Sequence, residues 1–235
     1  MQKNKILFLI RAYNEATRIV SVIESIFHAG FDQILIIDDG STDDTRELIE
    51  KHFPENIIFV RHPINRGAGA ALETGFAFIR RYHEKSKWDY VVTFDADGQH
   101  DIEDISGFIE VFEEKAETQV VYGSRFITKT RSNVPRLRRV LLWWGKIFTS
   151  LISWVSLTDA HNWYRMFRRE VIQKIRLTMD GMEYASELID EIYMRGFTIR
   201  EVPVNIHYDS YTLGKWQKHG GALRIAMRMI YKKFF

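Results

Sequence analysis

The chain has 235 residues, of which 46% are hydrophobic and 27% charged, enough to build one globular domain with a substantial core. It contains no cysteine, which excludes disulfides and thiolate metal sites. The first 120 residues hold 13 Lys and Arg against 22 Asp and Glu, and the rest hold 20 against 9, so the net charge of +2 conceals an acidic half and a basic half. The acidic half suits a cation, and the basic half suits phosphate or an anionic surface.

The first half of the chain alternates between predicted strands and predicted helices. Segments rich in Ile, Val and Phe predict strands at residues 5–10, 33–39, 56–62 and 88–97. Apolar residues at helical spacing predict helices over about 15–28, after the Ser41–Asp44 turn, and over about 69–82. This alternation predicts an α/β fold, with a mostly parallel central sheet and helices on both faces.

Three of the predicted strands end in conspicuous polar groups. These ends are the segments 11–15 (RAYNE), 38–41 (DDGS) and 95–97 (DAD). Each of them alone fits an ordinary turn or helix start, but all three in this order are less expected by chance. Because ligands of such sheets bind beyond the carboxyl ends of the strands, we expect the three ends to converge on one ligand-binding rim.

Asp95 and Asp97 predict a metal site at this rim. Two carboxylates two residues apart are hard oxygen ligands that suit Mg²⁺ or Mn²⁺, with phosphate and water completing the coordination. Such a metal would neutralise charge on a departing nucleoside diphosphate. Gly67 and Gly69 allow either close approach of a loop to a ligand or a simple turn, and their spacing satisfies neither the P-loop nor the dinucleotide pattern.

The second half is basic and contains two amphipathic segments. Residues 118–126 predict a further strand, and residues 137–157 carry apolar side chains at helical spacing with tryptophans that suit a water–lipid boundary. An ordinary core helix is the alternative for 137–157. Residues 216–235 predict a basic amphipathic helix, with Arg224, Arg228 and Lys232 four residues apart. No stretch of about 20 uncharged apolar residues occurs, so we expect neither a transmembrane helix nor a secretory signal.

Several motifs occur in an order that resembles one enzyme family. They are AYNEA, IIDDGSTDDT, RGAGAALETGF, DADGQH, VYGSRF, DAHNWYRMFRRE and REVPVNIHY. Over about residues 4–215 the chain resembles family 2 glycosyltransferases of the GT-A (Rossmann-like) fold, and most closely the polyprenyl-phosphate, dolichol-phosphate mannose synthase-like, sugar transferases. The resemblance implies a GT-A domain over residues 1–215, which includes the candidate interface helix 137–157, with the helix 216–235 appended.

The resemblance also implies roles for individual residues. Nucleotide-sugar binding is implied for Ala12, Tyr13, Glu15, Ile37, Asp39, Asp95, Ala96 and Asp97. Metal binding is implied for Asp95, Asp97 and Gln99. Catalytic roles are implied for Asp97, for Arg125 and Arg165 beside the phosphates of donor or acceptor, for Glu187 beside the active site, and for Lys215 in a segment that closes over the diphosphate.

Three places depart from the family pattern. Arg11 stands where a proline usually opens the first motif, and Asp209 stands near the place of an arginine. The segment 162–165 (NWYR) is bulkier than the usual pattern. The segment around Lys215 also resembles a bacterial subgroup that acts with small membrane proteins in surface-polysaccharide pathways, which implies a small integral membrane protein as a possible partner.

The favoured function is metal-dependent, inverting transfer of a sugar from a UDP- or GDP-sugar to a membrane polyprenyl phosphate. The acceptor phosphate is already an anion near neutral pH, so it needs little help from a general base. We expect a cytoplasmic protein that associates peripherally with the membrane, and the basic residues carry no nucleic-acid-binding pattern.

Two alternatives remain. A family 2 enzyme that transfers to a sugar hydroxyl of a growing surface glycan would need a general base, for which Glu187 and Asp159 are the candidates. A catalytically silent, nucleotide-binding membrane adaptor is motivated by Arg11 and Asp209, and the intact set of Asp95, Asp97 and Gln99 argues against it.

Overall fold

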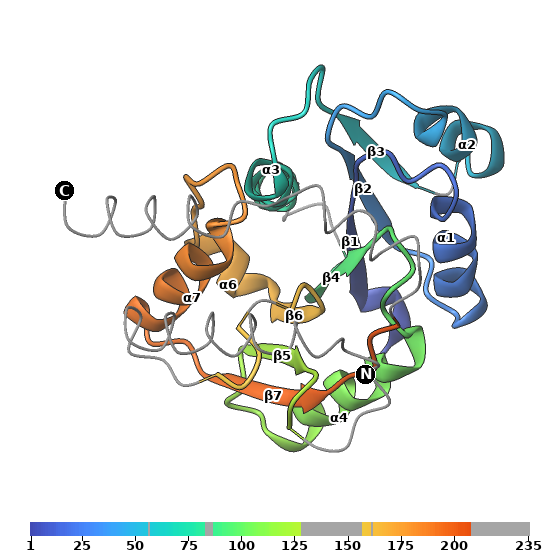
Figure 1. Cartoon of the computed structure of the whole chain (residues 1–235). Helices are drawn as coiled ribbons and strands as arrows, with labels where there is room; N and C mark the ends of the chain where they lie inside the picture. Colours follow the sequence, from blue (N-terminus) through green and yellow to red (C-terminus); the bar gives the residue numbers. More distant parts are fainter. Residues whose placement is uncertain (56, 83–86, 128–156, 161, 208–235) are drawn as a thin grey trace.

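The computed structural model describes residues 1–55, 57–82, 87–127, 157–160 and 162–207 (Figure 1). The predicted helices at 137–157, apart from its last residue, and at 216–235 lie outside these residues, as do Asp209 and Lys215. Among the described helices none is long and apolar enough to cross a membrane.

A seven-stranded sheet forms the centre of the molecule (Figure 1). Its strands lie in the spatial order β3-β2-β1-β4-β6-β5-β7. Strand β6 pairs antiparallel with β4 and β5, and the other pairings are parallel, which confirms the predicted mostly parallel sheet. The strands are β1 (Ile6–Ala12), β2 (Ile34–Asp38), β3 (Ile58–Arg61), β4 (Tyr90–Asp95), β5 (Val120–Ser124), β6 (Arg165–Arg168) and β7 (Ile199–Pro203).

Helices cover both faces of the sheet. The apolar residues of α1, α2 and α4 pack with one set of strand side chains, and those of α3, α6 and α7 pack with the other set. The helices are α1 (Ile19–His28), α2 (Thr45–His52), α3 (Ala68–Arg81), α4 (Ile105–Glu114), α6 (Arg169–Lys174) and α7 (Tyr184–Met194), with 3₁₀ turns at Lys3–Lys5 and Ile102–Asp104.

Strand β1 shows why the sequence builds two cores. Successive side chains of a strand point to opposite faces, so Phe8 and Ile10 enter the core beneath α1, while Leu7 and Leu9 enter the core beneath α3. All four are at most 1% exposed. Burial on both faces explains the nearly continuous apolar run of this strand, which is typical of parallel sheets. Because β1 lies between β2 and β4, the residues that follow it meet those that follow β2 and β4.

Candidate active site

The strand register brings the predicted polar ends together. Arg11 lies opposite Asp95 in the pairing of β1 with β4, and Ala12 lies opposite Asp38 in the pairing of β1 with β2. All three strands run in the same direction, so the loops that follow them leave the same edge of the sheet. The expected rim therefore forms, and Ala12 lies at its centre.

Hydrogen bonds join the loop after β1 to the loop after β2. Asn14 has a φ of 55°, in the left-handed region that asparagine tolerates better than most residues. Its backbone N–H donates to Ser41 Oγ at 2.9 Å, and its Oδ1 accepts from Thr42 N at 2.8 Å. The N–H of Glu15 donates to Thr45 Oγ1 at 2.8 Å. These bonds fix the first two rim loops, and they leave the Tyr13 ring 41% exposed beside them.

Asp95 is held as an anion by two basic side chains. Arg11 Nε lies 3.2 Å from its Oδ1, and His100 Nε2 lies 3.4 Å from its Oδ2. Burial alone would raise the pKa of this carboxyl, but the charges of Arg11 and His100 outweigh burial and lower the pKa of Asp95 to about 2. Asp95 is thus ionised and paired within the protein.

The surrounding protein stabilises the charged form of Asp97 less than that of Asp95. Burial, and then the negative charge of Asp95, raise the pKa of Asp97 to about 7. Its Oδ1 accepts the backbone N–H of Gln99 at 3.0 Å, so Gln99 closes the turn after β4. A cation beside Asp97 would stabilise its charged form, which is the property expected of a metal ligand.

The residues at the rim fit a divalent cation of the Mg²⁺ type. Within the described part of the chain, no three His, Asp or Glu side chains gather into a complete metal cage. Magnesium in nucleotide enzymes commonly uses one or two carboxylates and takes its remaining ligands from phosphate and water. Asp97 and Gln99, with the paired Asp95 beside them, suit that incomplete protein shell.

Asp39 is buried and organises the loop after β3. Its side chain contacts His62 Nδ1 at 2.7 Å and accepts the backbone N–H groups of Arg66 at 2.9 Å and Gly67 at 2.8 Å. The other ring nitrogen of His62 lies 2.9 Å from Thr74 Oγ1. Asp39 is 4% exposed, so its binding role would depend on the acceptor capacity that these three contacts leave.

The glycine loop contacts protein. The N–H groups of Gly69 and Ala70 donate to the carbonyl of Asp180 at 2.8 and 3.2 Å, and a Cβ on Gly69 would collide with the carbonyl of Met179. Gly67 has a φ of 105°, which side-chain-bearing residues rarely adopt. Close packing of two protein loops therefore accounts for both glycines, in keeping with a structural turn at these positions.

Two of the other predicted catalytic residues, Arg125 and Glu187, have partners within the protein. Arg125 forms a buried pair with Asp159, with Nη2 2.6 Å from Oδ1. Glu187 accepts hydrogen bonds from Thr178 Oγ1 at 2.6 Å and Met179 N at 2.9 Å. These carboxylates and Arg125 hold loops together.

Arg165 and the small residues of the rim are buried as well. Arg165 has no exposed surface, and its guanidinium lies 4.7 Å from the Tyr122 ring centre and 5.8 Å from that of Tyr184. Ile37 is fully buried in β2, and Ala96 is 2% exposed between the two rim aspartates. The structure thus collects residues 11–15, 39 and 95–99 at the rim, while Arg165 lies in the core between the sheet and α7.

Arg11, in the predicted rim segment 11–15, and Trp163 were given no role in the site by the sequence. The guanidinium of Arg11 lies 4.4 Å from the Trp163 ring centre while it pairs with Asp95. The sequence signal was present, because both residues lie where the chain departs from the pattern that it otherwise resembles.

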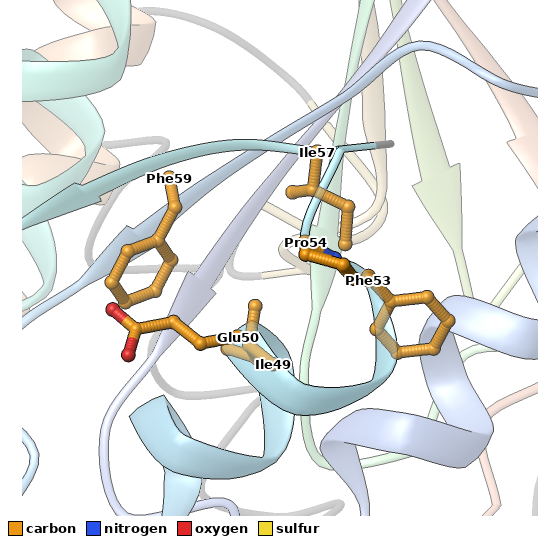
Figure 2. A pocket seen from close by; sticks show the side chains of 6 residues that line it. All are labelled: Ile49, Glu50, Phe53, Pro54, Ile57 and Phe59. Carbon is orange, nitrogen blue, oxygen red and sulfur yellow. The ribbon is translucent and has the colours of Figure 1, made fainter.

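An apolar groove lies away from the rim. It has a volume of about 140 Å³ and is lined by residues at the end of α2 and the start of β3: Ile49, Glu50, Phe53, Pro54, Ile57 and Phe59 (Figure 2). The start of β3 lies at the amino-terminal ends of the parallel strands, whereas the rim lies at their carboxyl ends, so this groove is remote from Asp97. It is also smaller than the roughly 300 Å³ typical of small-molecule sites, so we assign it no part in the chemistry.

Comparison with known proteins decides the family. The model of the family described as glycosyl transferase family 2 matches residues 8–176, more than half of the chain. The chain belongs to glycosyl transferase family 2. This confirms the family inferred from the motifs, and this family 2 chain is accordingly a glycosyltransferase.

Two curated relatives match nearly the whole family 2 chain. It is 29% identical to the UDP-N-acetylglucosamine–dolichyl-phosphate N-acetylglucosaminyltransferase of Methanococcus voltae, over 99% of this chain and 96% of that one. It is 29% identical to the polyprenol monophosphomannose synthase of Mycolicibacterium smegmatis, over 94% of this chain and 83% of that one.

A solved structure confirms the fold of this family 2 chain. Glucosyl-3-phosphoglycerate synthase from Mycobacterium tuberculosis, solved in complex with Mn²⁺, uridine diphosphate and phosphoglyceric acid, matches with a TM-score of 0.71. The match covers 97% of this chain and 78% of that one at 18% identity. The predicted GT-A fold is thus confirmed.

Proposed function

We propose that this glycosyltransferase moves a sugar from a nucleotide-sugar donor to a membrane polyprenyl phosphate, with a divalent cation and with inversion at the anomeric carbon. The observation that carries the proposal is the position of Asp97 at the rim, beside an already paired Asp95, with a pKa raised to about 7. A carboxyl in this state is suited to share a cation with a diphosphate.

The rim would hold the donor. Tyr13, 41% exposed beside the fixed loop of Asn14 and Glu15, offers an aromatic ring to a nucleotide base, and Asp39 supports the neighbouring loop after β3. Mn²⁺ or Mg²⁺ held by Asp97 and Gln99 would supply positive charge to the leaving diphosphate. The Mn²⁺ and uridine diphosphate of the structural neighbour support this arrangement and favour a uridine-type donor.

The acceptor is chosen on two grounds. The curated relatives named above carry dolichyl-phosphate and polyprenol monophosphomannose in their names. A phosphate monoester is already ionised at neutral pH, so the reaction needs orientation and charge stabilisation more than a general base. Attack from the face opposite to the diphosphate then inverts the anomeric centre.

Transfer to a sugar hydroxyl would need a general base, and the two candidates named for it, Asp159 and Glu187, are both engaged in other contacts. Asp159 is bound by the guanidinium of Arg125, and Glu187 is bound by Thr178 and Met179. A hydroxyl acceptor needs a carboxylate placed to take its proton, and both candidates already hold other groups of the protein in place. This observation favours the phosphate acceptor.

Membrane association completes the proposal. A polyprenyl phosphate lies in the bilayer surface, so the enzyme would work as a peripheral protein at the cytoplasmic face, attached through the predicted segments 137–157 and 216–235. A small integral membrane partner and a role of Lys215 at the diphosphate stay predictions.

The test compares two lipids that differ only in the phosphate. Purified protein with Mn²⁺ or Mg²⁺ is incubated with a panel of UDP- and GDP-sugars and either a short polyprenyl phosphate or the corresponding free polyprenol, and products are identified by mass. We expect a glycolipid from the phosphate and none from the alcohol. Transfer to a soluble glycan with none to the phosphate would move the assignment to the glycan-acceptor alternative.

A further inference from the structure

Arg11 occupies an unusual place at the end of β1. The residue is directly opposite Asp95 in the strand register, and its Nε lies 3.2 Å from Asp95 Oδ1. The two side chains are 28% and 18% exposed, so the pair is partly shielded from water. A pair of this kind is stronger than one at the open surface, because solvent screens it less.

Trp163 provides a platform for the guanidinium. Cζ of Arg11 lies 4.4 Å from the centre of the Trp163 ring, within the range in which a flat guanidinium stacks on an aromatic face. Trp163 is 4% exposed and packs edge-on against Tyr184 at 5.4 Å. The stack therefore has a rigid base on α7, and the two departures from the family pattern contact each other.

The two rim aspartates, Asp95 and Asp97, have different partners. Asp95 has Arg11 on one oxygen and His100 on the other, whereas within the described part of the chain Asp97 accepts a hydrogen bond from the backbone N–H of Gln99 and pairs with no basic side chain. A divalent cation that bound Asp95 would have to displace Arg11 or accept a second positive charge within a few ångströms. Either outcome costs binding free energy.

We propose that Arg11, stacked on Trp163, is a positioning residue that keeps Asp95 in a permanent ion pair and out of the coordination of the metal, so that Asp97 is the one aspartate of the two that binds it. This inference rests on the proposed function for the presence of a metal at the rim. It predicts that the Arg11–Asp95 pair restrains metal affinity, since Arg11 both repels a cation and occupies a carboxylate.

The test measures Mn²⁺ binding alone, from the electron paramagnetic resonance signal of free Mn²⁺. Arg11→Gln should bind Mn²⁺ about tenfold more tightly than the unaltered protein, because it removes a positive charge and frees Asp95. Arg11→Lys, which keeps the charge, should stay within about threefold of the unaltered protein. Arg195→Gln, at a surface arginine that pairs with Glu191, is the matched control and should change nothing.

The decisive variant removes the pair as a unit. Arg11→Gln with Asp95→Asn replaces an ion pair by two neutral side chains and leaves Asp97 untouched, so Mn²⁺ affinity should stay within about threefold of the unaltered protein. If Asp95 is a metal ligand, the double variant will bind Mn²⁺ more weakly than this, and the inference is overturned. An unchanged affinity in Arg11→Gln would overturn it too.

Two further features keep the test interpretable. If Arg11→Gln alone lacks a cooperative unfolding transition, the double variant carries the test, because it leaves no unpaired buried charge. The Mn²⁺ titration uses neither donor nor acceptor. Failure of the proposed lipid transfer would therefore appear only in the glycolipid assay, separately from failure of this inference.

Discussion

Replacing Asp97 by Asn should stabilise the metal-free protein, and increasingly so at higher pH. The folded protein raises the pKa of Asp97 to about 7, first through burial and then through the charge of Asp95. A carboxyl with a raised pKa in the folded state favours folding only while it is protonated. Stability is therefore highest below the ordinary aspartate pKa, falls as the pH rises from about 4 to about 7, and stays low above 7.

The size of the effect follows from that pKa. The difference from an ordinary aspartate corresponds to about 4 kcal/mol at most. The carboxyl is half-buried at a rim that water reaches, so screening reduces this value, and we expect Asp97→Asn to gain about 1–2 kcal/mol over the unaltered protein at pH 8. The gain should be smaller at pH 5, where the folded carboxyl is already protonated.

Urea unfolding in the presence of EDTA at pH 5 and pH 8 measures the free energy of unfolding directly. Asp32→Asn, at an exposed residue far from the rim, is the control and should differ little from the unaltered protein at either pH. The reasoning would be refuted by an Asp97→Asn protein that is no more stable at pH 8, or by a gain that is the same at both pH values.

Three other predictions follow from the same contacts. Mn²⁺ binding should tighten as the pH rises through about 7, because Asp97 releases a proton when the cation binds. Calorimetry in buffers of different protonation enthalpy measures this proton release. A Mn²⁺ affinity that does not change from pH 6 to 8 would contradict the prediction. Gly69→Ala should lower the free energy of unfolding by about 2 kcal/mol, because the added carbon collides with the facing loop. Gly107→Ala in α4, where the added carbon would meet Val202 at 3.9 Å, is the control and should be neutral or stabilising by up to about 1 kcal/mol. Equal effects of the two substitutions in urea unfolding would contradict this packing. Asp159→Asn should cost about 3 kcal/mol, because it removes the carboxylate charge that pairs with the buried Arg125 guanidinium. A loss below about 1 kcal/mol would show that the pair is not buried in solution.

The sequence predicts the first half of the fold well because its signals are local. Strands β1, β2 and β4 are apolar runs that end in polar groups, and α3, predicted over about 69–82, spans Ala68–Arg81. Strands β6 and β7 were not predicted, because Arg and Glu interrupt their apolar residues and because they depend on pairing with strands that are distant in the chain. Arg165–Arg168 has only four residues, and its partners are β4 and β5.

The candidate site shows the same division. The carboxylates of β4 could be read directly from DAD, and the convergence of strand ends follows from a parallel sheet. The partners of individual side chains could not be predicted. Asp159 meets Arg125 across 34 residues, and His62 meets Asp39 across 23, since only the folded chain brings them together. A motif thus identifies a residue type at the rim, and tertiary contacts decide which charges are free to act.

The measurement that most directly tests the central claim is sugar transfer to polyprenyl phosphate by the unaltered protein and by Asp97→Asn, each with Mn²⁺ and with EDTA. We expect a glycolipid only for the unaltered protein with Mn²⁺, with the Asp97→Asn protein folded but inactive. A glycolipid formed equally well by Asp97→Asn, or in EDTA, would contradict the assignment of Asp97 as the metal-binding carboxylate of a metal-dependent transferase.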